Sequence, residues 1–516
     1  MDHTTDTPSQ RTPELSQRRW RVLVVASIGV FLAALDSSIL AVALPAISSD
    51  LHLTFSQALW VQASYILIVT VLLIPTGRWA QRQGHLRVYF LGVLLFGVFS
   101  VMAAFSFDGL FLIVARVLLG MGSALILTTS AAIVAAAFPP GERGRALGLN
   151  MMALTVGMTL GPPVGGLIVT HLGWPWIFLI KVPIAAATLL AGWDLLGAER
   201  LDRAAAAAGA SQDRRAEDAR AEGSRMDFRG AALLGMLLTS LFVPLIFSPL
   251  WGWNSWRTIA PLAGAAVLVV VFVLVENRTR DPILDLDLFR RSRVFTAANT
   301  ASLLYNASAY GVTIFTAVFL EVVQGRSAQV AGLVLLVQPA VMTIITPIAG
   351  RLSDRLGSRG LSALGMVVTA AGTGQLGLIS ASAPTWQVVV ALATLGLGLA
   401  IFSTPNFSAI MGSVNRSELG VASGLFATAR FCGMGVSIAI LGAIAASKLG
   451  REGGRVILLG ASAGVSNAQA FAAGYREAML VGTGFAVAGA LVSLVRERDS
   501  GKERPLRKAG ATQPPT

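Results

Sequence analysis

The stretch Gly157-Met158-Thr159-Leu160-Gly161-Pro162-Pro163-Val164-Gly165-Gly166 lies inside an apolar run that extends from Ala146 to Thr170. Glycine stands at positions 157, 161 and 165, which places a stripe without side chains along one face of a helix. Such a stripe lets a second helix approach closely, as it does between helices packed within membranes. Pro162 lacks a backbone donor and is expected to bend the helix. The stretch therefore indicates a bilayer-spanning helix in close contact with a neighbour.

Around fourteen apolar runs follow one another between Arg21 and Leu494. Each has about the 20 residues that a helix needs to cross the hydrocarbon core of a bilayer. Of the 516 residues 54% are hydrophobic and 13% are charged, which is too apolar a composition for a soluble protein. The sequence therefore predicts an all-α polytopic membrane protein with lipid as its main solvent. The expected spans are residues 21–44, 55–76, 88–107, 110–137, 146–170, 174–197, 230–249, 257–275, 294–323, 328–350, 361–380, 386–411, 419–447 and 478–494.

The positions of the basic residues decide what the formal net charge of +13 means. In a soluble protein this balance would suggest a nucleic-acid partner. Here the arginines fall in every second loop, which is the positive-inside pattern of membrane proteins. We therefore expect no nucleic-acid partner and both termini in the cytoplasm, although the loop between Lys448 and Arg476 departs from the pattern. The loops that carry it contain Arg78, Arg82, Arg87, Arg143, Arg145, Arg351, Arg355 and Arg359.

The order of the spans divides the chain into two halves. The first apolar run is too long for a cleaved signal peptide, so we expect it to be retained as the first span. The expected parts are a cytoplasmic N-terminus (1–20), a first six-helix bundle (21–197), a cytoplasmic linker (198–228), two additional transmembrane helices (229–276), a cytoplasmic loop (277–293), a second six-helix bundle (294–495) and a cytoplasmic tail (496–516).

A weak internal repeat relates the two halves. Gly77-Arg-Trp-Ala-Gln-Arg82-Gln-Gly84 follows the second span of the first bundle. Gly350-Arg-Leu-Ser-Asp354-Arg355-Leu-Gly357 follows the second span of the second bundle. Repeated halves of this kind are typical of transporters in which two bundles rock around a central cavity.

Several strings together resemble the major facilitator superfamily, and in particular its fourteen-span drug:proton antiporter family. Leu35-Asp36-Ser-Ser-Ile-Leu-Ala-Val-Ala-Leu-Pro45 is similar to the acidic motif of that family's first span, and Trp60 with Tyr65 matches an aromatic pair in its second. Arg116-Val-Leu-Leu-Gly-Met-Gly122 resembles its proton-transfer motif. The stretch from Gly157 to Gly166 resembles its antiporter motif, although glycine packing alone would explain that string equally well.

The resemblance covers nearly the whole chain, including the additional pair of helices. It implies a major facilitator fold with two six-helix bundles, two extra helices between them and 14 spans in all. It also implies export by antiport, with a small-molecule substrate, protons and the lipid bilayer as partners and a proton gradient as the energy source.

Asp36 and Arg116 are the two charged residues for which the resemblance implies proton coupling. Taking about 1.5 Å per residue, both lie about 10–13 Å below the outer end of their spans. Because charges in a bilayer interior are costly, we expect them to face the cavity or each other. Asp36 would then take up a proton when its guanidinium neighbour leaves or its surroundings become drier. The alternative is a static ion pair that holds two helices together.

Four further residues are candidates for contact with substrate. Lys181 stands where the family usually has asparagine, and either lines the cavity, favouring an anionic substrate, or extends outward to the lipid headgroups. Glu321, near the outer end of its span, is either a second protonation site or an interfacial residue. Arg430 lies near mid-membrane and Tyr65 in the second span, and both are expected to line the cavity. Gln62, Asn299, Tyr305, Asn306, Tyr310, Gln338 and Asn406 either contact substrate or bond a neighbouring helix.

Some positions depart from the family pattern. Gln81 replaces an aspartate in the first cytoplasmic motif, whereas the second copy retains Asp354. Ala41 and Leu119 replace polar residues near Asp36 and Arg116. These changes predict a weaker cytoplasmic latch in the first half and an altered coupling network.

The sequence favours a non-enzymatic transporter. The four histidines are scattered, the single cysteine lies in an expected span, and no phosphate-binding loop is present, so we expect no metal, no cofactor and no use of ATP. The function expected is proton-coupled export of amphiphilic organic compounds, such as drugs or antibiotics, from a bacterial cell across the plasma membrane. Two alternatives remain open. One is a dedicated exporter of one endogenous metabolite or natural product, which would be anionic if Lys181 lines the cavity. The other is an uncoupled membrane receptor or scaffold.

Overall fold

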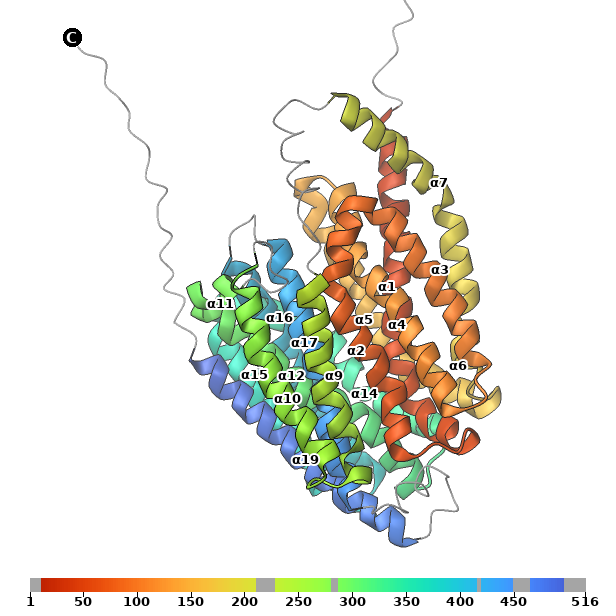
Figure 1. The fold of residues 1–516 in the computed structure, drawn as a ribbon, viewed down its shortest axis with the longest axis vertical. Helices are drawn as coiled ribbons and strands as arrows, with labels where there is room; N and C mark the ends of the chain where they lie inside the picture. The colour runs from red at the N-terminus through yellow and green to blue at the C-terminus, as the bar shows by residue number, and fades with distance from the viewer. Residues whose placement is uncertain (1–10, 210–227, 280–285, 415–418, 449–464, 496–516) are drawn as a thin grey trace, which may run out of the picture.

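The computed structural model describes residues 11–209, 228–279, 286–414, 419–448 and 465–495, and the regular structure in these ranges is entirely helical (Figure 1). Thirteen of the described helical stretches are long and apolar enough to cross a membrane. A shorter apolar stretch, Ala232–Ser248, belongs to a further helix of 24 residues. The expected all-α fold is confirmed, and all fourteen expected spans correspond to helices.

The first bundle is formed by the helices before the linker. Their bounds are α1 Arg11–Asp50, α2 Phe55–Gln83, α3 His85–Ala104, α4 Gly109–Ala137, α5 Pro140–His171, α6 Trp176–Leu179 and α7 Lys181–Gly209. The expected span 174–197 is thus divided into α6 and α7. Pro183 explains the start of α7, because proline lacks an N–H and fits only the first turn of a helix. Helix α7 also continues into the expected linker, of which residues 210–227 lie outside the described part.

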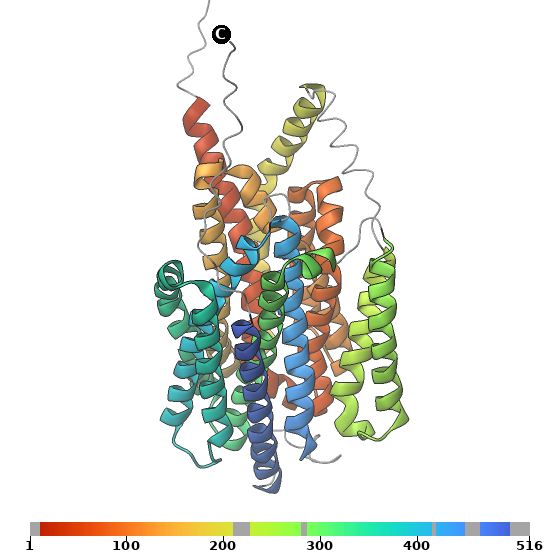
Figure 2. The same ribbon diagram turned by 90° about the vertical axis from the view of Figure 1, so that its left-hand side faces the viewer.

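The additional pair and the second bundle follow. Their helices are α9 Phe228–Trp251, α10 Trp256–Glu276, α11 Leu286–Arg291, α12 Arg293–Val318 with a π-turn at Phe319–Val323, α13 Ala328–Leu335, α14 Val337–Leu356, α15 Ser358–Leu378, α16 Thr385–Gly412, α17 Leu419–Ser447 and α19 Val465–Leu494. Helix α9 packs against α2 and α17, and α10 lies outside it, so that the pair forms one edge of the molecule (Figure 2). Helix α19 starts 13 residues before the expected span 478–494.

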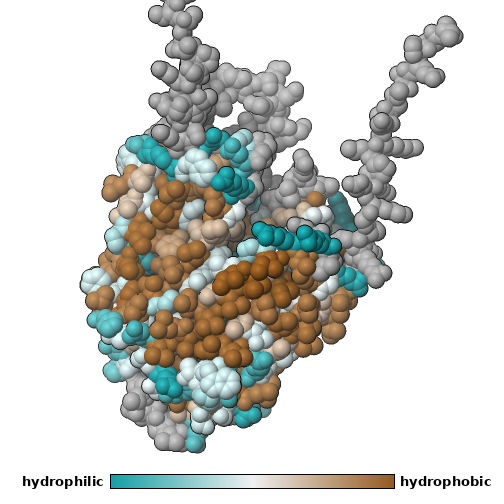
Figure 3. All heavy atoms as spheres, turned by 180° about the vertical axis from the view of Figure 1, so that it is seen from behind, coloured by the Kyte–Doolittle hydropathy of each residue, from teal (hydrophilic) through white to brown (hydrophobic). Residues whose placement is uncertain are grey.

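The two ends of the molecule differ in charge. We call the end that carries Arg78, Arg87, Arg145, Arg355 and Arg359 the basic end, and the end that carries Trp174 the opposite end. Between them, apolar side chains form a broad belt over the face drawn in Figure 3, with polar side chains towards both ends. Many exposed residues in the spans are large and hydrophobic, among them Val98, Leu190, Val270 and Ile344. This surface suits contact with lipid tails.

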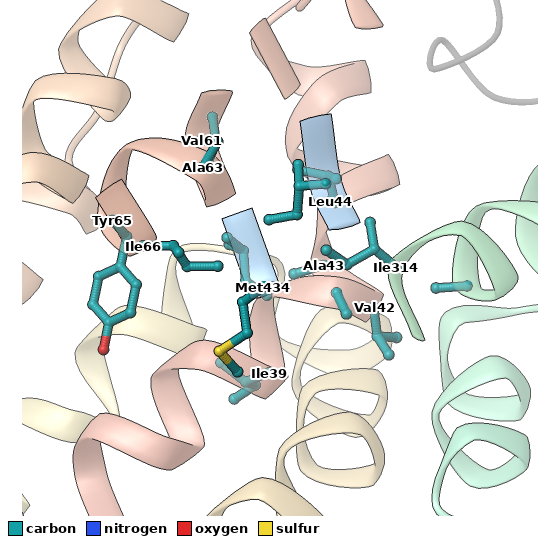
Figure 4. Close-up of a cluster of buried hydrophobic side chains, with 14 of the residues drawn as sticks. Ile39, Val42, Ala43, Leu44, Val61, Ala63, Tyr65, Ile66, Ile314 and Met434 are labelled. Carbon is teal, nitrogen blue, oxygen red and sulfur yellow. The ribbon is translucent and has the colours of Figure 1, made fainter. Parts of the chain in front are cut away.

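The bundles meet most closely near the opposite end. A side chain at Gly166 on α5 would come within 2.5 Å of the Ala328 carbonyl oxygen on α13. Likewise, a side chain at Gly442 on α17 would come within 2.6 Å of Leu59 on α2. Residues of both bundles also share one buried cluster (Figure 4), in which Ile39, Val42 and Ile66 of the first lie with Ile314 and Met434 of the second. The backbones of α5 and α13 can touch because glycine leaves room for them.

Candidate functional site

Asp36 lies between two cations inside the first bundle. One of its carboxylate oxygens accepts a 2.5 Å hydrogen bond from Arg116 Nη1 on α4. The other oxygen accepts from Lys181 Nζ at the start of α7. The exposed fractions are 1% for Asp36 and 0% for both Arg116 and Lys181, so the group is closed to solvent. The sequence-based expectation that Asp36 and Arg116 face each other or the cavity is therefore resolved in favour of a direct ion pair.

The Arg116 guanidinium is held on every side. Its Nε donates to the Val61 carbonyl oxygen at 3.0 Å, and its Nη2 donates to Gln62 Oε1 at 3.3 Å. The Tyr65 ring lies 4.4 Å below the guanidinium, at a distance suited to a cation–π contact. Three residues within about one turn of α2 thus position one side chain of α4.

Tyr65 is part of this support. Its hydroxyl donates to Ser123 Oγ at 2.8 Å, and the side chain is buried. The residue was expected to line the cavity. In this conformation it instead fixes the Arg116 side chain from below.

Lys181 occupies the site because α6 ends just before it. The break at Ile180 places the lysine on the first turn of α7, directed to Asp36. Its Nζ lies 4.6 Å from the Phe178 ring and 5.5 Å from the Phe96 ring. The side chain does not extend to the lipid headgroups, and in this conformation it exposes no surface to a substrate. The reason is the nearby carboxylate, which offers a buried ammonium a counter-ion.

A hydrogen-bond chain connects this cluster with the second bundle. Gln62 Nε2 donates to the Tyr310 hydroxyl on α12 at 2.5 Å and to the Ser37 carbonyl oxygen at 3.1 Å. The Tyr310 hydroxyl donates to the same carbonyl oxygen at 3.2 Å. The polar residues of the cluster are therefore bonded, through a single amide, to a side chain of the other half.

Sequence reasoning left the role of Gln62 and Tyr310 open between substrate contact and helix contact. For Gln62, one feature of the sequence favours a contact with a neighbouring helix. Gln62 and Arg116 both stand seven residues after the first residue of helices that start at the same end, so they lie at the same depth.

The glycines of α5 pack mainly against α1. Side chains at Gly157 and Gly165 would come within 2.6 Å of the Phe31 carbonyl oxygen and 2.9 Å of the Ile39 carbonyl oxygen, and a side chain at Gly161 would collide with Ser38. Pro162 and Gly166 instead face α13, where Gly332 and Ala328 lie against them. One face of α5 thus holds the helix that carries Asp36, and another touches the second bundle.

Arg430 on α17 faces the boundary between the bundles. Its Nη2 contacts the Met158 sulfur on α5 at 3.3 Å. Tyr305 and Tyr310 are its electrostatic neighbours. Within the described ranges, no carboxylate forms an ion pair with Arg430. A partly buried cation without a counter-ion is suited to attract a negatively charged group.

Glu321 lies in the π-turn that ends α12, at the opposite end. Its Oε1 atom is buried and has no hydrogen-bond partner in the described part of the chain. None of the ion pairs among the described residues joins it to Asp36, Arg116 or Lys181.

The two repeated loop motifs form matching helix ends at the basic end. Gly84 follows α2 with φ of 104° and Gly357 follows α14 with φ of 83°, a region that favours glycine. The N–H of Gly84 bonds the Ala80 carbonyl and that of Gly357 bonds the Ser353 carbonyl. Gly77 and Gly350 lie one turn or more earlier, and Arg82 and Arg355 are exposed. The side chain of Asp354 is outside the described part.

Comparison with known proteins agrees with this architecture. The model of the Major Facilitator Superfamily matches residues 26–438. The tetracenomycin C resistance and export protein of Streptomyces glaucescens is 32% identical over 84% of this chain and 78% of its own length. The riboflavin transporter RibZ of Clostridioides difficile is 29% identical over 80% of this chain and 85% of its own length.

A solved structure has the same fold. The crystal structure of a D-xylose-proton symporter superposes with a TM-score of 0.63 at 16% identity, covering 94% of this chain and 99% of that chain. The protein is a multi-pass membrane protein with relatives that confer antibiotic resistance. The chain therefore belongs to the Major Facilitator Superfamily, and its sequence is consistent with membership of the drug:proton antiporter family within it.

Proposed function

We propose that the protein is a proton-coupled antiporter that exports amphiphilic organic compounds from the cell by alternating access. The observation that supports this most is the buried group of Asp36, Arg116 and Lys181, which is bonded through Gln62 to the second bundle. A proton gained or lost inside this group would change the charge next to the Gln62 amide, which connects the group with Tyr310. Coupling between a proton and a movement of the two halves needs such a connection.

The orientation follows from the arginines. With the basic end in the cytoplasm, both termini would lie inside the cell. The close contacts of Gly166 with Ala328 and of Gly442 with Leu59 would then close the extracellular side. In our proposal this conformation is the inward-facing one, in which substrate enters from the cytoplasm or the inner leaflet.

The substrate class is proposed from the relatives and from the boundary between the bundles. The tetracenomycin C resistance and export protein is named for an antibiotic, which supports an amphiphilic organic compound. Arg430 and Met158 would contact it, since a thioether adapts to apolar ligands of varied shape. Substrate binding there would lie beside Tyr310 and hence beside the link to Asp36.

Vesicles containing the purified protein would test coupling. We expect an imposed proton gradient to drive uptake of fluorescent amphiphiles into inside-out vesicles, and we expect Asp36→Asn to abolish the response to the gradient. Asp108→Asn is the matched control, because Asp108 caps α4 at the opposite end and asparagine caps a helix equally well. A native protein that moves no compound in response to the gradient would contradict the proposal, as would an Asp36→Asn variant that retains the full response.

A dedicated exporter of one endogenous metabolite is the second candidate. The similarity to a protein named as a riboflavin transporter favours it. The same vesicles decide between the two: competition by many unrelated amphiphiles supports broad export, and saturation by one metabolite alone supports the dedicated exporter.

A further inference from the structure

The charges of the buried cluster do not balance. Asp36 contributes one negative charge, whereas Arg116 and Lys181 contribute two positive charges when both are protonated. In the part of the chain that the structure describes, Asp36 is the sole carboxylate that pairs with either cation. All three side chains are excluded from solvent. With Asp36 ionised and both Arg116 and Lys181 protonated, the cluster therefore has a net charge of +1 within the membrane.

Only two of the three groups can exchange a proton. Arginine stays protonated in proteins. Protonation of Asp36 would leave Arg116 and Lys181 as two buried cations without an anion, which is the most costly state of the cluster. Loss of the proton from Lys181 would instead leave a neutral Asp36–Arg116 ion pair beside an uncharged amine. Charge balance thus favours the lysine as the group that changes.

We propose that Lys181 Nζ carries the proton that this transporter exchanges, and that Asp36 stays ionised throughout the cycle. The inference rests on the proposed function, and it identifies the atom at which coupling occurs. The ammonium is closed to solvent in this conformation, and the binding of substrate gives cytoplasmic water access to it. The N–H bond then breaks, water takes the proton, and a neutral amine is left. The amine recovers a proton from water on the extracellular side after the protein changes conformation.

The surroundings of Lys181 suit this role. Phe178 of α6 and Phe96 of α3 face the amine, and aromatic rings stabilise its cationic form less than water would. The charged or titratable groups around it are Asp36 on α1, Arg116 on α4 and Tyr65 on α2, whose hydroxyl bonds Ser123. On α3, the Tyr89 hydroxyl is occupied by Val25 and Gly29. No described group other than Asp36 thus counterbalances the ammonium.

The change of charge would reach the second bundle through Arg116. With the ammonium present, Asp36 is shared between two cations, and with the amine neutral it pairs with Arg116 alone. A stronger pull on the guanidinium weakens its bond to Gln62 Oε1, which is already 3.3 Å long. The same amide holds Tyr310, so the proton on Lys181 influences the bond between the halves.

Two substitutions separate this proposal from a proton carried by Asp36. Lys181→Arg keeps a positive charge that cannot be released, and Lys181→Met keeps a side chain of similar length without a charge. We expect each to lower gradient-driven transport at least tenfold, while exchange of labelled for unlabelled substrate without a gradient continues. If the carboxylate is the carrier, both variants retain the gradient response, and the proposal is wrong.

A direct count of protons completes the test. Detergent-solubilised native protein in weak buffer with a pH indicator should release close to one proton per bound substrate, and neither Lys181 variant should release any. Proton release of native size from Lys181→Arg or Lys181→Met would overturn the proposal. Native protein that shows no gradient-driven transport at all would instead overturn the proposed function, so the two failures are distinguishable. Thermal unfolding and gel filtration show whether each variant is folded, and the second variant serves if the first is not.

Discussion

Gln62 on α2 accepts a hydrogen bond from Arg116 with its carbonyl oxygen and donates one of 2.5 Å to the Tyr310 hydroxyl on α12 with its amide nitrogen. A single side chain thus contacts the ion cluster of the first bundle and a residue of the second. When the bundles separate at this point, the Tyr310 bonds must break. Their strength therefore contributes to the stability of the conformation in which this side is closed.

Removal of the Tyr310 hydroxyl should weaken that closed conformation. Tyr310→Phe loses the bonds to Gln62 and to the Ser37 carbonyl. A net loss of about 1–2 kcal/mol would shift the equilibrium between open and closed states by about 5–30-fold. The shift can be measured as faster labelling of a cysteine introduced near Gly166 in a Cys432→Ala background. Tyr475→Phe is the control, because its bond to Thr316 lies within the second bundle. Equal labelling of both variants would contradict the prediction.

Gly161→Ala should destabilise the protein, because the added methyl group collides with Ser38 and with the backbone of Ile39. Overpacking of this kind costs about 1–3 kcal/mol. In Gly148→Ala, on the same helix, no atom lies within 4 Å of the new methyl group. This variant should gain about 1 kcal/mol in free energy of unfolding, because alanine favours a helix more than glycine does. Thermal unfolding in detergent measures both. We expect Gly161→Ala to lower the free energy of unfolding and Gly148→Ala to raise it. A Gly161→Ala variant with unchanged stability would show that α1 and α5 separate easily.

Arg430→Met should reduce binding of anionic compounds. The guanidinium contacts Met158 and has two tyrosines as electrostatic neighbours, so an anionic ligand gains a favourable partner there. We expect the variant to bind a carboxylate-bearing fluorophore about tenfold more weakly, which corresponds to about 1.4 kcal/mol of binding free energy. Its affinity for the neutral ester of the same fluorophore should not change. Equilibrium binding followed by fluorescence anisotropy provides the comparison. Arg476→Met, in which the lost bond is to the Gly377 carbonyl, should alter neither affinity.

Trp174→Phe should lower the free energy of unfolding. The indole N–H donates to an Asp50 oxygen at 2.8 Å and so connects the end of α1 with the loop before α6. Loss of a hydrogen bond to a charged acceptor costs about 1–3 kcal/mol. Trp176→Phe is a matched control, since that ring is 48% exposed and a surface substitution of this kind changes stability by less than about 0.5 kcal/mol. The melting temperatures of the two variants should differ by about 1–3 °C, because the entropy of unfolding of a chain of this length is about 1 kcal/mol/K.

Much of the fold could be predicted from the sequence. The length and apolarity of each run gave the helices, and α17 begins and ends where expected, at Leu419 and Ser447. These properties depend only on the order of residues, because a single apolar segment that crosses the hydrocarbon core satisfies its backbone hydrogen bonds within itself only as a helix. The ends of α1 and α19 were less predictable, since these helices extend beyond the apolar runs. The roles of the site residues stay predictions.

Depth in the membrane could likewise be calculated from residue counts, and for this reason Asp36 and Arg116 were expected at one level. The direction of a side chain around its helix axis could not, because it depends on how the helices pack against one another. Lys181 illustrates the difference. From its sequence position, the side chain could lie in the cavity or extend to the lipid headgroups. The helix break before Pro183 and the Asp36 carboxylate direct it inward.

The sequence by itself thus determined a chain of membrane-spanning helices, the division into two halves and the family, since hydrophobicity, length and motif are properties of the linear chain. Only the tertiary structure decided that Lys181 joins Asp36 and Arg116, that Tyr65 supports the guanidinium, and that Gln62 bonds Tyr310. Each of these contacts joins residues of different helices. The rotation and tilt of the packed helices, which no local pattern encodes, bring them within bonding distance.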